Sequence, residues 1–332
     1  MPAAPTTDLP SARDIPLAAQ RLAGHATRTP VLIAETLLAS SGCKVFCKAE
    51  NLQRTGSFKF RGAYHRLSSL TAEERSRGVV AWSSGNHAQG VALAARELGI
   101  RARIVMPSDA PDIKTANTLA LGAEVIPYDR FSEDREAIAY ELADREGCVV
   151  VPSYDDPHII AGQGTAGLEL MEDVPELDVL LVCCSGGGLV AGCALAAEHL
   201  ARDIAIYTVE PEDFDDHRRS FVSGCRERNS GQVNSFCDAL LAPTPGEITF
   251  AINKPRLAGG LVVTDEEVAD AIRFAFEHLK VVLEPGGAVA LAAVLADKVP
   301  GDKKHLGVIL SGGNIDRSLF SSILGNSKPE NA

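Results

Sequence analysis

From about Gly78 onward, short apolar runs alternate with helical patterns, and this alternation restricts the possible folds more than any other feature. In the first half, the pattern predicts strands at 79–82, 102–106, 124–127 and 148–151. Strands that alternate with helical crossovers build parallel sheets with helices packed on their faces. The sequence therefore predicts an α/β protein.

The second half repeats the alternation, with strands predicted at 179–184, 204–210 and 307–310 and helices at about 187–200, 266–279 and 286–297. Thr264 and Glu267 have the spacing of a capping box for the middle helix. Between 213 and 260 the periodicity weakens and Gly, Ser, Asn and Pro accumulate, so we expect an irregular connection there. We expect residues 1–10 to form a loose tail, 11–25 a helix, and 29–31 and 45–49 strands.

The composition favours a globular protein that acts on small molecules. A chain of 332 residues with 45% hydrophobic content can form two lobes with sizeable cores, and the net charge of −12 argues against nucleic acid or an anionic membrane as partner. No apolar run reaches the roughly 20 residues that span a bilayer, and the first residues lack the pattern of a signal peptide. Eight cysteines without a CxxC pair fit a reducing cytoplasm.

The segment 51–63 places a single lysine, Lys59, at the predicted start of a helix. Thr55 or Ser57 can cap this helix, and apolar residues recur at helical spacing from Phe60 onward. A cation in a first turn opposes the helix dipole, so a purely structural role would favour an acidic residue there. A solvated surface lysine is the alternative interpretation.

Three other motifs supply what a lysine-bound aldehyde cofactor with a phosphate arm requires. The sequences Trp-Ser-Ser-Gly-Asn-His at 82–87 and Cys-Ser-Gly-Gly-Gly-Leu at 184–189 each follow a predicted strand and open a helix, and Ile-Leu-Ser-Gly-Gly-Asn at 309–314 closes a late strand. Together with the lysine segment, they resemble the fold-type II pyridoxal-phosphate (PLP) enzymes of the serine/threonine dehydratase and serine racemase branch. The resemblance covers about residues 17–324.

This resemblance implies a two-domain fold like that of the tryptophan synthase β chain, each domain being an open, mostly parallel sheet flanked by helices. Residues 1–77 and 156–332 would form a discontinuous large PLP-binding domain, and residues 78–155 a small mobile domain. The family is typically dimeric or tetrameric, so a homodimer or homotetramer is expected.

The glycine-rich turn at 185–188 offers consecutive backbone amides directly ahead of a helix, which is a favourable place for a phosphate dianion. Glycines also serve tight turns between strand and helix, so the turn alone is weak evidence. The resemblance assigns phosphate binding to Ser185, Gly186, Gly187 and Gly188. Ser185 replaces the first of the four glycines usual in the family.

PLP chemistry needs an amine that holds the aldehyde and can then remove the α-proton of an amino acid, and the resemblance assigns both tasks to Lys59. It places Phe58 against the cofactor ring, with core packing as the alternative for such a phenylalanine. It also implies that Ser311 meets the pyridine nitrogen, that Asn86 reaches the ring oxygen, and that Glu284 lies close to the cofactor.

The segment from Ser83 to His87 would hold the substrate carboxylate on its backbone amides; its members are Ser83, Ser84, Gly85, Asn86 and His87. In the family, serine at the position of Ser84 is typical of racemases and hydroxyaspartate dehydratases, where it can transfer a proton on the face opposite Lys59. The alternative is that Ser84 only caps the helix at 86–98.

Arg135 and Tyr154 fall where the family lines the pocket for the substrate side chain. Arg135 could pair with a β-carboxylate, which would favour 3-hydroxyaspartate. Tyr154 differs from the Phe or Asn more usual at its position, which leaves the polarity of the pocket open.

Five carboxylates follow a predicted strand in the segment 209–216. Their spacing matches the cation site of serine racemase-like enzymes, so Glu210, Asp216 and the carbonyl of Phe214 are candidate ligands for Mg²⁺, Mn²⁺ or Ca²⁺. An acidic loop that is simply solvated is the alternative.

The predicted function is a PLP-dependent dehydratase that releases a 2-oxo acid and ammonia from an L-3-hydroxy amino acid such as threonine, serine, 3-hydroxyaspartate or phenylserine. A racemase that uses Lys59 and Ser84 as paired bases is the alternative within enzymes, and a PLP-fold binding protein without turnover is a third. With 332 residues the chain leaves no room for an appended regulatory domain, so inhibition by isoleucine is not expected.

Overall fold

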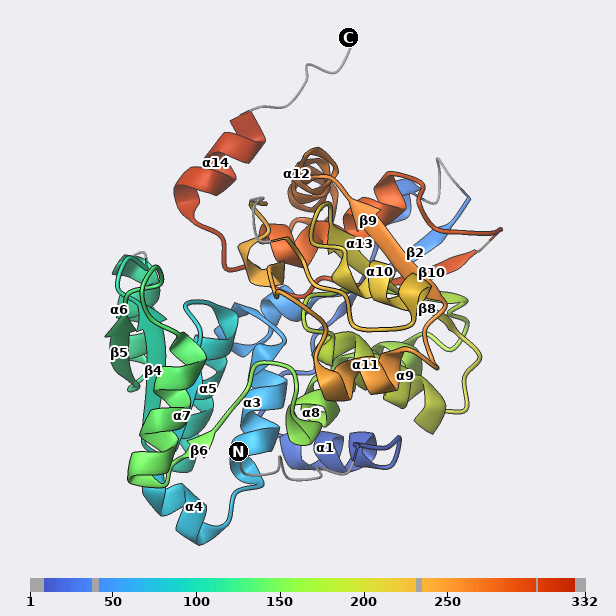
Figure 1. Ribbon diagram of the computed structural model, residues 1–332. Coiled ribbons are helices and arrows are strands. Elements are labelled where there is room, and N and C mark those ends of the chain that lie inside the picture. The colour runs from blue at the N-terminus through green and yellow to red at the C-terminus, as the bar shows by residue number, and fades with distance from the viewer. Residues whose placement is uncertain (1–8, 38–41, 111, 231–234, 303, 326–332) are drawn as a thin grey trace.

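A computed structural model describes residues 9–37, 42–110, 112–230, 235–302 and 304–325. Its strands form two sheets, which lie in separate lobes (Figure 1). The smaller sheet has the strand order β5-β4-β3-β6 and is parallel throughout. Its strands are β3 (Val79–Trp82), β4 (Ala102–Pro107), β5 (Glu124–Tyr128) and β6 (Val149–Val150). The helices α4 (Ala72–Arg77), α5 (Asn86–Leu98), α6 (Asp112–Ala120) and α7 (Arg135–Glu146) accompany it.

The larger sheet has the order β1-β2-β10-β7-β8-β9, and only its edge strand β1 is antiparallel to its neighbour. Its strands are β1 (Val31–Ile33), β2 (Lys44–Lys48), β7 (Val179–Cys183), β8 (Ala205–Pro211), β9 (Gly259–Val263) and β10 (His305–Ile309). The α/β architecture with mostly parallel sheets is confirmed. The exact division into domains at 77/78 and 155/156 stays a prediction.

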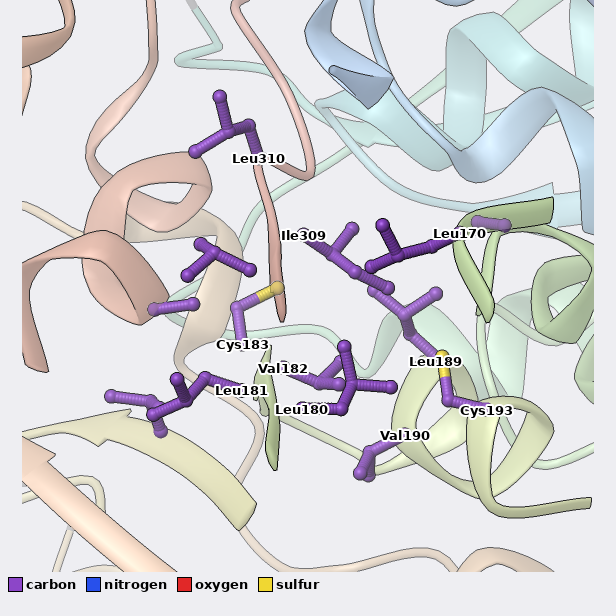
Figure 2. Packing of buried hydrophobic residues seen from close by; sticks show 14 of the residues in the cluster. Leu170, Leu180, Leu181, Val182, Cys183, Leu189, Val190, Cys193, Ile309 and Leu310 are labelled. Carbon is purple, nitrogen blue, oxygen red and sulfur yellow. The ribbon is translucent and has the colours of Figure 1, made fainter. Parts of the chain in front are cut away.

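Helices cover both faces of the larger sheet, which explains its continuous apolar strands. Figure 2 shows the alternation along β7, with Leu180 and Val182 toward one helical layer and Leu181 and Cys183 toward the other. The covering helices are α8 (Pro157–Asp173), α9 (Gly188–His199), α12 (Asp265–Phe274), which continues as a π-helix (Ala275–Leu279), and α13 (Pro285–Leu295). The helices α1 (Asp14–Leu22) and α14 (Arg317–Gly325) are the first and the last in the chain order of the described elements.

Helix α3 (Lys59–Ser68) packs against both α5 and α8 and so lies between the two lobes (Figure 1). Glycines allow the close approach. A Cβ on Gly90 of α5 would lie 3.1 Å from the carbonyl carbon of Lys59, and one on Gly162 of α8 would lie 2.7 Å from the carbonyl oxygen of Arg61. The position of α3 therefore depends on both lobes.

A buried ionic network fixes α3 from behind. Arg61 is 1% exposed and pairs with Glu50, which is fully buried, at 2.8 Å, and with Glu169 at 2.7 Å. The ammonium of Lys48 lies 2.6 Å from the same Glu169. Each charge in the network has a partner of opposite sign, as burial of charged groups requires.

The expectation of an irregular connection over 213–260 is wrong in part. This segment contains α10 (Asp216–Ser223), a short 3₁₀ turn (Asp238–Leu240), α11 (Glu247–Asn253) and the start of β9. Carboxylates from outside these helices hold their first turns: Glu210 accepts from the amides of His217 and Arg218, and Asp155 accepts from that of Glu247. Because these carboxylates lie outside the helices that they cap, the hydrophobic periodicity of the segment could not predict the two helices.

The expected caps of α3 are also wrong. The N-cap position is Phe58, which provides no side-chain hydrogen bond. Thr55 has a left-handed φ of 61° inside a 3₁₀ turn (Arg54–Gly56), preceded by another 3₁₀ turn (Glu50–Leu52). The capping box of Thr264 and Glu267 is confirmed.

Of the tail expected at 1–10, residues 1–8 lie outside the described ranges. Among the helices of the described ranges, none combines the length and apolar character needed to cross a bilayer.

Candidate active site

Lys59 is the first residue of α3, so its amine stands at the positive end of the helix dipole, as the sequence predicts. The side chain is partly buried; its Nζ donates to the carbonyl of Ser153 at 2.7 Å and lies 5.1 Å from the centre of the Phe58 ring. Desolvation lowers the pKa of Lys59 from 10.5 to about 8, with a smaller opposing effect from Cys183. A lysine perturbed in this way supplies a neutral amine, the form that attacks an aldehyde.

The glycine turn directly precedes α9, and Gly187 has a left-handed φ of 92°. No hydrogen bond among the described residues uses the amide hydrogen of Gly186, Gly187 or Gly188 as donor. A Cβ on Gly186 would lie 2.3 Å from the ring of Tyr154, and one on Gly187 would lie 2.5 Å from His217 Nε2. Free amides at a helix N-terminus, on backbone that only glycine can provide, fit a phosphate group.

Side chains of α11 hold the carbonyl groups of this turn by hydrogen bonds. Thr249 Oγ1 donates to the carbonyl of Gly186 at 2.6 Å, and Asn253 Nδ2 donates to that of Gly187 at 3.3 Å. Ser185 Oγ accepts from the amide of Ala242 at 3.1 Å, which leaves its own hydrogen to donate. The carbonyls of Gly186 and Gly187 are therefore engaged by the protein, whereas the amides of the turn are left for a ligand.

A short segment connects the amine with the glycine turn. The carbonyl of Ser153, which holds Lys59, also accepts from Gln163 Nε2 at 3.3 Å. The next residue is Tyr154, whose ring lies over Gly186, and burial raises the pKa of its phenol to about 12. Lys59 and the turn thus lie on two sides of residues 153–154.

Ser311 lies beside the lysine segment. The amide of Phe58 donates to the carbonyl of Ser311 at 3.1 Å, and Ser57 pairs with Gly312 in an isolated antiparallel bridge. Ser311 is buried, and its Oγ is 3.5 Å from the carbonyl of Gly286. The Ser311 side chain also hydrogen-bonds the Cys183 thiol, so its two protein partners are a long carbonyl contact and a weak sulfur acceptor.

Asn86, Glu284 and Asn314 form a hydrogen-bonded chain between the two lobes. Asn86 Nδ2 donates to Glu284 Oε1 at 2.5 Å, and Asn314 Nδ2 donates to Asn86 Oδ1 at 2.7 Å. Burial raises the pKa of Glu284 to about 8. The sequence pointed to Asn86 and Glu284 and gave Asn314 no role, although Asn314 ends the motif at 309–314.

Ser84 does not cap α5. The N-cap position is Gly85, which makes no side-chain cap, and the amide of Gly85 donates instead to Ser83 Oγ at 3.1 Å. The interpretation of Ser84 as the cap of α5 is therefore wrong, and its role in the site stays a prediction. His87 is buried with Nε2 at 2.9 Å from the Val151 carbonyl, and burial lowers its pKa to about 3, so its ring is neutral.

Arg135 is the first residue of α7 and is exposed. Its positive charge lowers the pKa of the Tyr154 phenol, against the larger raising effects of burial, Glu136 and Asp155. Its contact with a substrate stays a prediction.

The candidate cation ligands Glu210 and Asp216 are both buried. Each Glu210 oxygen accepts one amide of α10 at 2.9 Å, and Asp216 Oδ1 accepts from Asn229 Nδ2 at 2.7 Å. Burial raises the pKa of both groups, that of Asp216 to about 7, and the Asp216 carboxylate reinforces the shift of Glu210. Phe214 is buried beside them, with its amide donating to the Pro211 carbonyl at 3.1 Å. The acidic segment is thus not simply a solvated loop.

The sequence matches the pyridoxal-phosphate dependent enzyme family over residues 22–312. It is 46% identical over 316 residues to L-threo-3-hydroxyaspartate ammonia-lyase from Pseudomonas sp, covering 95% of this chain and 99% of the relative. It is 44% identical to serine racemase from Schizosaccharomyces pombe, covering 95% and 98%. The structure of threonine deaminase isoform 2 from Solanum lycopersicum, in its processed form, superposes with a TM-score of 0.87 at 32% identity, covering 98% of this chain and 94% of that one.

Proposed function

This chain belongs to the pyridoxal-phosphate-dependent enzymes, and from that premise we propose that it is a dehydratase that converts an L-3-hydroxy amino acid into a 2-oxo acid and ammonia. The observation that supports this most directly is the Lys59 amine, held by Ser153 beside a turn of unpartnered amides. Relatives named as hydroxyaspartate ammonia-lyase and threonine deaminase support elimination.

Each residue has a defined task in this proposal. The amides of Gly186–Gly188 bind the phosphate of the cofactor, and Lys59 holds its aldehyde. When bound, the cofactor supplies an electron sink for the substrate α-carbon. Lys59 takes the α-proton on its Nζ, and the backbone amides of 83–87 orient the substrate carboxylate. Ser311 would offer the ring nitrogen of the cofactor a neutral hydroxyl partner.

A racemase is the second candidate, supported by Ser84. Its hydroxyl is not used as a helix cap, so it is available to carry a proton on the face opposite Lys59. In this proposal Ser84→Ala abolishes racemisation and spares much of the elimination. Equal loss of both activities would contradict the separate roles of the two bases.

The substrate test is an assay of ammonia and 2-oxo acid release with serine, threonine, 3-hydroxyaspartate and phenylserine. The guanidinium of Arg135 near Tyr154 supports 3-hydroxyaspartate, whose β-carboxylate it can pair with. Arg135→Ala should then reduce kcat/KM for 3-hydroxyaspartate more than for threonine. Equal reductions of kcat/KM for the two substrates would contradict a contact between Arg135 and the substrate side chain.

An absorption band at about 410–420 nm that disappears in Lys59→Ala would distinguish the enzyme from a binding protein without the lysine-linked cofactor. Absence of the band in the unmodified chain would favour the binding protein.

We further propose a divalent cation, Mg²⁺, Mn²⁺ or Ca²⁺, on the carboxylates of Glu210 and Asp216 and the carbonyl of Phe214. The buried carboxylate pair supports it, because two neighbouring buried acids need a cation or a proton.

Assembly as a homodimer or homotetramer and a cytoplasmic location complete the proposal. The buried cysteines Cys47, Cys148, Cys183, Cys184, Cys193 and Cys237 are thiols, which supports a reducing compartment.

A further inference from the structure

Behind the glycine turn, Cys184, Glu210 and His217 offer one ligand atom each, and these atoms all lie within 4.8 Å of one another. The register of the sheet brings the first two together. Cys183 of β7 lies opposite Val209 of β8, so Cys184 and Glu210 follow side by side and point to the same face. His217 comes from the first turn of α10, which its own amide ties to Glu210.

The imidazole of His217 is fully buried; the backbone of Ser185 approaches the ring, but neither ring nitrogen makes a hydrogen bond of good geometry. Its Nδ1 lies 3.8 Å from Glu210 Oε1 and 3.8 Å from Asp216 Oδ2, and that Asp216 oxygen also lacks a partner. Its Nε2 faces the back of Gly187. Unpartnered polar atoms at such depth are rare in folded proteins and require an explanation.

The charges of the cluster are unbalanced. Among the ion pairs between described residues, none joins Glu210 or Asp216 to a lysine or an arginine. The nearby Arg218 and Arg219 pair with Asp215 instead. A bound cation would balance the two acids and give His217 Nδ1 a partner.

We propose that Cys184, Glu210, His217 and Asp216 bind a divalent transition metal such as Zn²⁺, with the thiolate of Cys184 and Nδ1 of His217 as direct ligands. The inference rests on the cation site proposed above and specifies its metal class. Oxygen ligands alone suit Mg²⁺ or Ca²⁺, whereas a sulfur and an imidazole nitrogen select zinc and its neighbours. Metal bonds of about 2.0–2.3 Å fit the cluster after a small contraction. On metal binding the Cys184 thiol releases its proton to solvent, and each carboxyl of Glu210 and Asp216 that holds a proton before the metal binds releases that proton as well.

The metal would also stiffen the phosphate site. With Nδ1 on the metal, the ring of His217 is fixed against the back of Gly187, and Gly187 contributes an amide to the turn. Zinc should therefore tighten cofactor binding, and the cofactor should tighten zinc binding by the same factor.

The experiment uses the cofactor-loaded protein after removal of metals with a chelator. Zn²⁺ affinity is measured by equilibrium dialysis with metal analysis, Mn²⁺ affinity by the same method, and the zinc ligands by X-ray absorption. We expect a sulfur neighbour at about 2.3 Å from zinc. Cys184→Ser should lower zinc affinity by roughly 100-fold or more, which exceeds the roughly 10–100-fold loss typical of a residue that only hydrogen-bonds a metal ligand. The same substitution should leave Mn²⁺ affinity within a few-fold of the unmodified protein. Cys193→Ala is the matched control, since Cys193 is equally buried on α9.

A zinc shell without sulfur, or equal zinc affinity in Cys184→Ser and Cys193→Ala, would overturn the inference. If Cys184→Ser does not fold, His217→Gln and the sulfur signal of the unmodified protein still decide the question. Mn²⁺ binding without a zinc–sulfur bond removes only the assignment of a zinc-like metal bound by Cys184 and His217. If neither metal binds, the proposal of a cation site is refuted as well. The ammonia-release assay tests the dehydratase proposal independently of these two metal proposals.

Discussion

Replacing Gly187 with alanine should weaken cofactor binding far more than it weakens the fold. The φ of 92° is left-handed, which costs an L-residue about 1–2 kcal/mol. The added methyl would lie 2.5 Å from His217 Nε2 and 2.9 Å from Asn253 Nδ2, and overpacking of this kind costs about 1–3 kcal/mol. The total strain is about 2–5 kcal/mol, which corresponds to roughly 30-fold to 4,000-fold in an equilibrium constant.

This strain should appear mainly in binding. Because the amides of the turn have no partners within the described structure, the turn can shift to relieve the clash when no cofactor is present. Binding then requires the strained conformation to be restored. The measurements are a titration of the apoprotein with PLP followed by absorbance, and a denaturant titration of the apoprotein for its free energy of unfolding.

Gly99→Ala is the control, since Gly99 is also left-handed, with φ 65°, but has open space around its Cβ position. It should lower stability by about 1 kcal/mol without changing PLP affinity. Equal PLP affinity of the Gly187→Ala and Gly99→Ala proteins would refute the assignment of the turn at 185–188 as the phosphate site.

Three further predictions concern the groups around the site. The rate of PLP capture by the apoprotein should rise with pH with a midpoint at about 8, because only the neutral Lys59 amine reacts; a midpoint near the ordinary 10.5 in stopped-flow absorbance would contradict this. Arg61→Ala should lower the free energy of unfolding by about 3–5 kcal/mol, because it leaves the buried Glu50 unpaired, whereas Arg28→Ala at an exposed ion pair should cost less than about 1 kcal/mol in the same denaturation assay. The pKa of Glu284 is about 8 in the folded protein and about 4.5 in the unfolded chain, so the folded state binds more protons between these pH values. The free energy of unfolding of the apoprotein should therefore fall as the pH rises from 4.5 to 8. Glu284→Gln should flatten this pH profile, and an unchanged slope would exclude Glu284 as its origin.

The parts of the site that the sequence predicts are those encoded locally. A strand, a glycine-rich turn and a helix succeed one another within about ten residues around Gly187, so the turn is readable from sequence alone. Lys59 is likewise found in a first turn, although the cap that the sequence suggested is not used.

The parts that the sequence could not predict depend on partners distant along the chain. Helix α11 begins where Asp155, 92 residues earlier, accepts the amide of Glu247. Asn314 gains its role only through Asn86, which is 228 residues away. His217 follows a run of acids, and only the packing of α10 on β8 turns its ring toward Gly187. None of these pairings leaves a periodic signal.

The place of β10 within the larger sheet sets the order in which a nascent chain can mature. Residues 79–150 contain every strand of the smaller sheet, so that sheet can form early on the ribosome. The larger sheet has a vacancy between β2 and β7 until residues 305–309 emerge, and pairing over such long separations is slow. Since Ser311 follows directly, we expect the proposed cofactor site to form only after residues 305–311 have been made and paired with the rest of the sheet.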